Sequence, residues 1–520
     1  MGRRPSQSMT PGHAAGPVLL GIDIGTTNSK GVACLPDGSI VGQVRLAHGV
    51  DRPSPGWAEH DAEHVWWGDT AAVCRELVAQ VGDASRVRAV AVTTCGPCLV
   101  PVDGAGRPLR AGILYGVDTR ATSEIERMEE RIGRAAIQRL GGMPLTSQSV
   151  GPKLAWVARH EPAVVRRTAT WHTATSFIVE RLAGVAAIDQ HQASYFGPFT
   201  DAEQRTWDLR YADGLDLAGR LPERHWPGEV AGTVTNDAAR ETGLRIGTPV
   251  LVGTSDGPME ALAVGAIEPG TVAIAHGSTT TLTTFAAPAG SPAGLWLTDG
   301  LTPDRPCVGA GLAATGTLIA WASAMFGGAL EGADARVVLG REAAASKPGA
   351  GGLLVLPSFA GEAAPVLGSA ARGVIAGLTL SHSRGDLYRA VLEGIAFGVR
   401  QLIESFESAG LPIHRLRATG GGTRDALGMQ IMSDVTGCAQ EVAPDGIGAA
   451  HGAARLAAGA VGLATSGDDW FVGSRRIEPD PATAATYDEA YRWFRALARD
   501  ARPTMHALVA LDHADRGGRG

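Results

Sequence analysis

Apolar and polar residues follow the same pattern near the start of each half of the chain. Residues 17–35 (PVLLGIDIGTTNSKGVACL) form an apolar run, a Gly-Thr-Thr turn and a second apolar run, which is typical of a β-hairpin. Residues 270–285 repeat this pattern around a His-Gly-Ser-Thr-Thr turn. The repeat lies in the pattern more than in identical residues. It predicts an internal structural duplication, with a domain boundary near residues 255–270.

Short apolar runs bounded by turn residues predict further strands, and runs with a helical period predict helices. The predicted strands lie at 40–46, 86–94, 98–102, 248–253, 352–356, 415–419 and 439–443. The predicted helices lie at 62–81, 119–140, 315–326, 385–409, 425–437 and 448–461. We therefore expect an N-terminal domain at 17–262 and a C-terminal domain at 263–505. A disordered leader (1–16) would precede them and a disordered tail (506–520) would follow.

Composition narrows the class of protein. At roughly 150 residues per domain, 520 residues suggest two to four domains, and 44% hydrophobic with 19% charged residues excludes wholesale disorder. The net charge of −7, without a basic stripe, argues against nucleic acid as a partner. There is no apolar run long enough to span a membrane, no apolar core of a signal peptide, and too few cysteines for a disulfide framework. We expect a cytoplasmic globular protein.

The first chemically informative motif is the turn of the N-terminal hairpin, Gly21 to Lys30 (GIDIGTTNSK). Successive backbone N–H groups, hydroxyls and a lysine in one tight turn make an anion-binding concavity. Lys30 is one of only three lysines in a chain with 46 basic residues. Asp23, at the end of the preceding strand, would point a carboxylate at the same place, to bind Mg²⁺ directly or through water. The alternative is an ordinary hairpin with a polar turn.

Two further motifs have the same character. His276 to Thr281 (HGSTTT) is the turn of the second hairpin, and two such turns facing each other would grip a polyphosphate from both sides. Residues 419–437 (TGGGTRDALGMQIMSDVTG) place three glycines between a strand and a helix, where a flat ligand can lie against bare backbone near a helix N-terminus. The alternative for this segment is a glycine-rich turn without a ligand. Together the three motifs favour a nucleotide site.

From about residue 17 to 465 the chain resembles the FGGY carbohydrate kinases, a family of the sugar kinase, actin and heat-shock-protein ATPase superfamily. GIDIGTTNSK resembles the first phosphate motif, HGSTTT the second, and TGGGTRDALGMQIMSDVTG the adenosine motif. SPGWAEHDAEHVWW, PKLAW and ARGVIAGLTLSHSRGDLYRAVLEG resemble other family segments. The resemblance implies two α/β domains of the actin-like, ribonuclease-H-like ATPase fold with a cleft between them. It also implies phosphorylation of a sugar hydroxyl, with ATP and Mg²⁺ as cofactors.

The resemblance further implies roles for individual residues. The family's catalytic base is an aspartate just before the second phosphate motif, which is Asp256 in VGTSDGPMEALAVG. Its carboxylate would accept the proton of the sugar hydroxyl, and it could also cap the helix that follows. Asp23 would assist catalysis by holding Mg²⁺. The nucleotide and its phosphates would be bound by Gly25, Thr26, Thr27, Asn28, Lys30, Gly277, Ser278, Thr279, Gly316, Gly420, Gly421, Gly422 and Asp425.

The predicted sugar pocket departs from the family pattern. Xylulokinases carry a Gln-Met-His-Gly element where this chain has Cys-Gly-Pro-Cys at 95–98. The family's W-x-D-x-R-type segment is one residue longer here, and Asp118 and Arg120 would keep its roles. Asp425 stands where glycerol kinases have an asparagine. The residues expected to contact the substrate are Gly96, Pro97, Cys98, Asp118, Arg120 and Asp256.

The substrate and two other classes of function stay open. Family similarity favours a ketose such as xylulose, and ribulose, erythritol and glycerol are alternatives. A non-catalytic sensor of ATP and sugar is an alternative of another class, as is a thiol–disulfide oxidoreductase using Cys95 and Cys98. The segment after Cys98, LVPVDGAGRP, has no helix signal, whereas a helix N-terminus lowers the pKa of a redox cysteine. The sequence does not distinguish a monomer from a homodimer.

Overall fold

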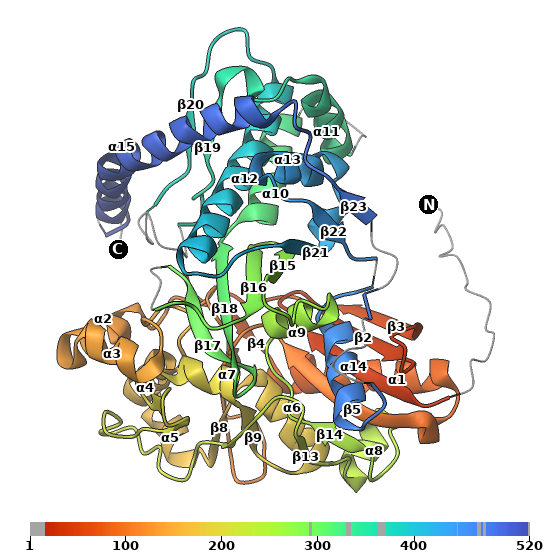
Figure 1. Ribbon diagram of the computed structural model, residues 1–520. Helices are drawn as coiled ribbons and strands as arrows, with labels where there is room; N and C mark the ends of the chain where they lie inside the picture. The colour runs from red at the N-terminus through yellow and green to blue at the C-terminus, as the bar shows by residue number, and fades with distance from the viewer. Residues whose placement is uncertain are drawn as a thin grey trace.

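The computed structural model describes residues 16–290, 294–328, 334–361, 371–444, 446–464, 470–471 and 475–517. Within them the chain forms two α/β halves, the first in the lower part of Figure 1 and the second in the upper part. Residues 1–15 of the predicted leader and 518–520 of the predicted tail lie outside the described residues. Each half is built on a mixed sheet that carries the predicted hairpin at its centre.

The N-terminal half contains a six-stranded sheet in the order β13-β14-β5-β1-β2-β3. Strand β1 runs antiparallel to β2 and parallel to β5, which in turn runs parallel to β14. The strands are β1 (Val18–Ile24), β2 (Asn28–Cys34), β3 (Ile40–Ala47), β5 (Val87–Thr94), β13 (Val230–Thr233) and β14 (Pro249–Leu251). Strand β1 is buried along its whole length, as expected for a central strand covered on both faces.

The C-terminal half repeats this arrangement in a seven-stranded sheet, β17-β18-β16-β15-β21-β22-β23. Here β15 is antiparallel to β16 and parallel to β21, and β21 is parallel to β22. The strands are β15 (Thr271–His276), β16 (Thr280–Phe285), β17 (Trp296–Thr302), β18 (Arg305–Leu312), β21 (Arg415–Thr419), β22 (Gln440–Val442) and β23 (Arg475–Ile477). The core order β18-β16-β15-β21-β22 thus matches β3-β2-β1-β5-β14. The predicted duplication is confirmed.

The helices of the N-terminal half cover its sheet and form a lobe beside it. They are η1 (Ala62–Gly68), α1 (Asp69–Val81), η2 (Ala84–Arg86), α2 (Thr122–Ile132), α3 (Arg134–Gly141), α4 (Val150–His160), α5 (Pro162–Arg167), α6 (Ala174–Ala183), α7 (Gln190–Ala193), η3 (Ser194–Phe196), α8 (Asn236–Thr242) and α9 (Asp256–Ala263). The single helix predicted at 119–140 is two helices, because Gly133 adopts φ +87° between them.

Short strands complete this half. They are β4 (Glu59–His60), β6 (Val100–Val102), β7 (Gly112–Ile113), β8 (Thr170–His172), β9 (Ala187–Asp189), β10 (Thr200–Asp201), β11 (Thr206–Trp207) and β12 (Glu223–His225). They pair two by two, β4 with β7, β6 with β8, β10 with β11 and β9 with β12. A separate apolar cluster around Trp171, Phe196 and Phe199 forms the core of the lobe.

Helix α14 (Ala449–Ala460) belongs to the second half in sequence but packs on the first sheet, and in Figure 1 it lies among the lower strands. The contact is backbone to backbone: a Cβ on Gly21 of β1 would lie 1.9 Å from Ala450 O, and one on Gly452 would lie 1.9 Å from Met259 O of α9. Both positions therefore require glycine. Helix α9 also packs against the second sheet, so α9 and α14 join the two halves.

The remaining helices and strands belong to the C-terminal half. They are α10 (Thr315–Gly327), α11 (Ala335–Ala345), η4 (Ala350–Gly352), β19 (Leu354–Leu356), β20 (Val374–Ala376), α12 (Arg384–Ser408), η5 (Gly421–Arg424), α13 (Ala426–Thr436) and α15 (Ala484–Gly517). Helix α15 runs through most of the segment that was expected to be a disordered tail from residue 506. No helix within the described ranges is long and apolar enough to cross a membrane.

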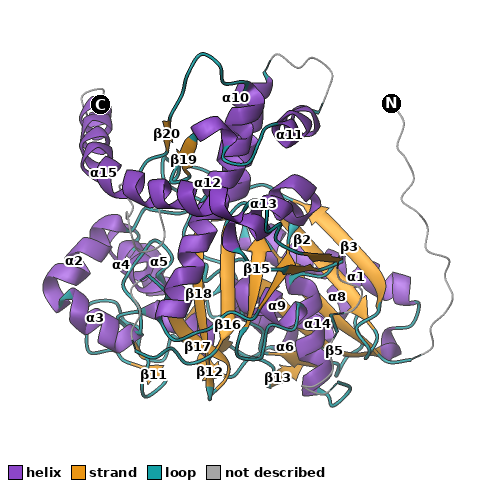
Figure 2. Cartoon of the chain, turned by 45° about the horizontal axis from the view of Figure 1, so that its top comes forward, coloured by secondary structure: helices purple, strands orange, loops and turns teal. Residues whose placement is uncertain are grey.

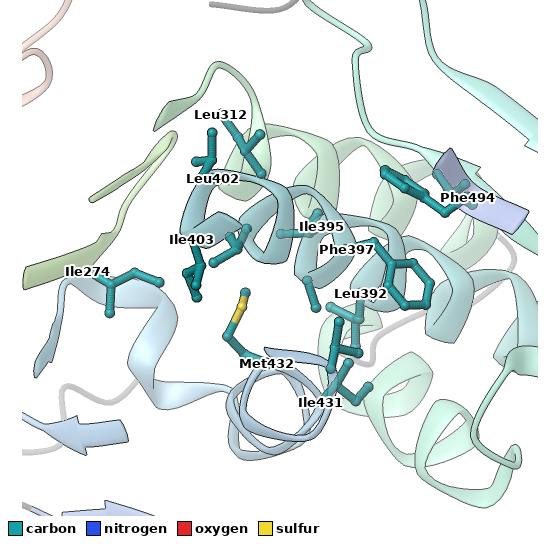
Figure 3. Packing of buried hydrophobic residues seen from close by; sticks show 14 of the residues in the cluster. Ile274, Leu312, Leu392, Ile395, Phe397, Leu402, Ile403, Ile431, Met432 and Phe494 are labelled. Atoms are coloured by element: carbon teal, nitrogen blue, oxygen red, sulfur yellow. The ribbon is translucent and has the colours of Figure 1, made fainter. Parts of the chain in front are cut away.

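Helix α12 is the centre of the C-terminal core. Its first turn is fixed by a capping box between Ser383 and Asp386. Its apolar side chains, among them Ile395 and Leu402, pack between the sheet and α13, as Figure 3 shows with Ile274 on one side and Met432 on another. In Figure 2, α12 lies beside the strands β16 and β18, α10 and α11 lie beyond it at the top, and α9 lies between β15 and α14.

Candidate active site

The carboxyl ends of three parallel strands bring together the first turn, the CGPC turn and Asp256. Strand β1 leads into the turn at Gly25–Thr27, β5 leads into Cys95–Cys98, and β14 is followed after four residues by Asp256. A bridge between Thr94 and Ser255 holds the last two segments side by side. The carboxyl edge of parallel strands is the usual place for a ligand in an open α/β sheet.

Asp23 lies on β1 directly opposite Lys30 on β2. Lys30 Nζ is 3.4 Å from Asp23 Oδ2, while the buried Oδ1 has no hydrogen-bond partner among the described residues. Burial raises the pKa of Asp23, and the charge of Lys30 opposes this shift. A buried carboxylate oxygen of this kind, beside an anion-binding turn, fits Mg²⁺ or one of its bound waters.

Asp256 is the first residue of α9, and Ser255 occupies the cap position. Its Oδ1 accepts hydrogen bonds from the N–H groups of Gly257 at 3.0 Å and Gly96 at 3.4 Å. Burial and the nearby charge of Asp23 raise the pKa of Asp256 to about 6. A carboxylate whose pKa lies this close to neutral pH suits the role of a general base. Asp256 is not the N-cap residue of α9, and Ser255 in that position makes no side-chain capping hydrogen bond.

Glu260 is a third carboxylate at this site, and the sequence motifs did not point to it. It follows Asp256 by one helical turn, so both side chains lie on the same face of α9. Burial, followed by the charges of Asp256 and Asp23, raises the pKa of Glu260 to about 8. The i, i+4 spacing from Asp256 was the signal available in the sequence.

The second turn is built by direct backbone contact between three segments. Gly277 N–H donates to Thr279 O at 2.8 Å, which closes the turn between β15 and β16. A Cβ on Gly316, at the start of α10, would lie 2.2 Å from Gly277 O, and one on Gly420 would lie 2.5 Å from His276 O. The second phosphate motif, Gly316 and the glycine triplet therefore form one cradle. Ser278 and Thr279 are exposed on it.

The triplet leads into η5 and then into α13. Gly421 and Gly422 are exposed, and Gly420 has φ +94°. Asp425 caps α13, since its Oδ1 accepts a hydrogen bond from Gly428 N–H at 3.1 Å. The carboxylate of Asp425 is thus committed at least in part to the helix. The exposed backbone beside the second turn is where a flat base would lie.

The CGPC turn contributes backbone rather than thiols. Cys95 and Cys98 are both buried, and Cys98 Sγ donates to Cys95 O at 3.2 Å. Gly96 has φ +44°, and a Cβ there would lie 2.7 Å from the side chain of Tyr115. The turn is followed by β6 rather than a helix. Hydrogen bonding to Cys98 and burial raise the pKa of Cys95, which disfavours thiolate chemistry.

Asp118 and Arg120 are engaged by other groups of the protein. Their side chains are fully buried and pair with each other at 2.7 Å, and Arg120 also pairs with Glu59 at 2.7 Å. The guanidinium lies 4.0 Å from the ring centre of Trp57. Asp118 Oδ2 accepts from Ala58 N–H at 2.7 Å. These contacts hold the 115–120 segment in place, and the contact of the two side chains with substrate stays a prediction.

Lys153 is also a positioning group. This buried lysine donates to Leu114 O and Ser147 O, each at 2.7 Å. It thereby ties the strand end before Tyr115 to the segment before α4. Burial lowers the pKa of Lys153 to about 8. A buried ammonium that is fully engaged with backbone carbonyls stabilises a loop geometry rather than a ligand.

The residues present fit a nucleotide with Mg²⁺. The second turn is exposed and the first is exposed at Thr27, Gly316 and Gly420 leave no room for a side chain, and Asp23 supplies a free carboxylate oxygen. A Mg²⁺ held at Asp23 would take its other ligands from phosphate oxygens and water. A cavity of about 970 Å³ lies elsewhere, between residues 104–111 and the helices α6 and α8, and none of the predicted site residues lines it.

Comparison with known proteins decides the family. The N-terminal domain of the FGGY family of carbohydrate kinases matches residues 18–263, and the C-terminal domain of that family matches residues 272–461. The chain belongs to the FGGY family of carbohydrate kinases. FGGY proteins are ATP-dependent phosphotransferases, and the two-domain α/β fold of this chain matches that of solved FGGY carbohydrate kinases.

Named relatives within the family differ in substrate. Glycerol kinase 1 of Streptomyces avermitilis is 28% identical over 94% of this chain and 98% of its own length. Xylulose kinase of Staphylococcus epidermidis is 25% identical over 95% and 99%. The crystal structure of xylulose kinase from Rhodospirillum rubrum has a TM-score of 0.86 and 33% identity, covering 94% of this chain and 100% of that one.

Proposed function

We propose that this FGGY kinase transfers the γ-phosphoryl group of ATP to a hydroxyl of a sugar or polyol, with Asp256 as the general base. The observation that carries the proposal is the position of the Asp256 carboxylate. Backbone N–H groups of Gly96 and Gly257 hold it between the first phosphate turn and the CGPC turn. Its raised pKa, about 6, lets it accept a proton near neutral pH.

The reaction follows from this arrangement. Asp256 accepts the proton of the substrate hydroxyl as that oxygen attacks the γ-phosphorus in line, and the bond to the β–γ bridging oxygen breaks to release ADP. The backbone N–H groups of Thr26 and Thr27 in the first turn, and of Ser278 and Thr279 in the second, stabilise the charge on the transferred group. Lys30 adds a positive charge on the same side. Mg²⁺, when bound beside Asp23, neutralises charge on the phosphate oxygens.

A ketose is the substrate class that we propose, with xylulose first. The support is the 33% identity to a xylulose kinase over nearly the whole chain. The CGPC turn argues against xylulose, because xylulokinases carry Gln-Met-His-Gly there and the buried thiols of Cys95 and Cys98 do not replace the Met-His contacts. Ribulose, erythritol and glycerol remain the competing substrates, since glycerol kinases are among the relatives of similar identity.

The test is Mg²⁺-dependent ADP formation with a panel of ketoses, aldoses, sugar acids and polyols. We expect one substrate class to raise turnover at least a hundredfold above the rate with water alone. A ketose giving that increase supports the proposal, and the same increase with glycerol alone would replace the ketose by a polyol. Binding of ATP without stimulation by any panel member would contradict the kinase proposal and favour a sensor.

A further inference from the structure

The turn between β1 and β2 is held by contacts that the proposed chemistry does not use. Its Thr26 carbonyl oxygen accepts from the His60 ring at 3.1 Å, and its Thr27 carbonyl oxygen accepts from the His48 backbone N–H at 3.0 Å. Within the described part of the chain, the N–H groups of Thr26 and Thr27 have no such partner. The carbonyls are thus engaged by the protein, and the amides are left for an anion.

The hydrogen bonds of His60 fix its tautomer. Trp66 Nε1–H, which can only donate, donates to His60 Nδ1 at 3.1 Å. His60 Nδ1 must therefore be unprotonated, and Nε2–H is the donor to Thr26 O. His60 and Trp66 are both almost completely buried, and burial lowers the pKa of His60 to about 4. The imidazole stays neutral and presents one fixed donor to the turn.

Tyr115 contacts the side chain of Thr26, whereas His60 contacts its backbone carbonyl. The Tyr115 hydroxyl lies 3.1 Å from Thr26 Oγ1, and the base of its side chain packs against Gly96 of the CGPC turn. Tyr115 therefore connects the phosphate turn to the predicted sugar pocket. Buried Lys153, which binds Leu114 O, fixes the backbone just before Tyr115.

We propose that His60 and Tyr115 are positioning residues that clamp Thr26 at its carbonyl and its hydroxyl, and so hold the Gly25–Asn28 turn in the shape that receives a phosphate. The proposal rests on the proposed function, because it assumes that this turn binds a phosphate of ATP. Neither residue contacts the reacting atoms. Their loss should weaken binding and use of MgATP more than binding of sugar, because preorganised donors act on the phosphates.

The test compares four variants. His60→Leu removes the donor to Thr26, His60→Gln can restore an N–H donor, and Tyr115→Phe removes only the hydroxyl. His172→Gln is the matched control, because His172 is an equally buried histidine of the same half that bonds Ser176 and Glu180 instead. Steady-state constants for MgATP and for sugar, the dissociation constant of MgATP and the melting temperature are measured for each.

We expect kcat/KM for MgATP to fall at least tenfold in His60→Leu and threefold or more in Tyr115→Phe, with KM for sugar within twofold of the wild type. His60→Gln should recover most of the loss. His172→Gln should lower only the melting temperature. If His60→Leu does not fold, Tyr115→Phe carries the kinetic test.

Wild-type constants for MgATP in the folded variants would overturn the proposed positioning role of His60 and Tyr115. An increase in the KM for sugar with no change in the constants for MgATP would overturn it as well. A wild-type protein that binds MgATP but phosphorylates no sugar contradicts the proposed function instead. The dissociation constants of MgATP for the same variants then decide the clamp separately.

Discussion

At the scale of single residues, the site is a group of carboxylates gathered around one lysine. Asp23, Asp256 and Glu260 share a small region in which the charge of Asp23 raises the pKa of Asp256, and the charges of both raise the pKa of Glu260. Lys30 is the cation that opposes these shifts, and it lowers the pKa of all three. We therefore expect Lys30 to favour the ionised form of Asp256, besides its predicted contact with phosphate.

The pH profile tests this role of Lys30. The base must be deprotonated to act, so kcat/KM for the sugar should rise with pH through the pKa of Asp256, about 6. Replacing Lys30 by Met removes the charge that lowers this pKa, so the acid limb should move to higher pH. Lys30→Arg keeps the charge and should leave the limb in place. An unmoved limb in Lys30→Met would mean that the lysine does not tune the base.

At the scale of elements, the strand ends and the glycine contacts build the site. The hairpin turns and the glycine triplet could be predicted because Gly, Thr and Ser between apolar runs are local signals. The burial of Asp118 and Arg120 could not be predicted from the sequence, because the partners of Arg120, Glu59 and Trp57, lie about 60 residues away in the chain. Likewise, the two helices between 122 and 141 depend on one left-handed glycine, Gly133.

Gly316 provides the test at this scale. Gly316→Ala would place a Cβ 2.2 Å from the Gly277 carbonyl oxygen, which is backbone and cannot move aside without deforming the second turn. We expect kcat/KM for ATP to fall about tenfold or more, equivalent to about 1.4 kcal/mol. Gly340→Ala is the control, because Gly340 lies in α11 with no atom within 4 Å of the added Cβ. That variant should keep full activity and gain about 0.4–1 kcal/mol of stability. Equal activity of the two variants would contradict the hypothesis that the contact between Gly316 and the second turn shapes the nucleotide site.

At the scale of the whole molecule, two copies of one sheet topology each carry a hairpin turn at the corresponding position. The sequence predicted this duplication because each hairpin shows the same local pattern. It did not predict that α14 returns to pack on the first sheet, since that contact rests on Gly21 and Gly452 meeting backbone of distant segments. The long helix α15 was also missed, and a disordered tail was expected over its last part.

Helix α9 links the two halves at the candidate active site. It begins with Asp256 beside the first turn and packs against the second sheet. The proposed role of Asp256 as the base therefore depends on the family resemblance, on the duplicated fold and on the electrostatics of the site together.

The most direct measurement is the turnover of Asp256→Asn with MgATP and the stimulating sugar, beside the binding of MgATP to the same protein. The asparagine keeps the shape and an oxygen for the Gly96 and Gly257 N–H groups but cannot accept the proton. We expect kcat to fall by 10²-fold or more, in the range of general-base catalysis, with MgATP affinity within about threefold of the wild type. Wild-type turnover by this variant would remove Asp256 from the mechanism.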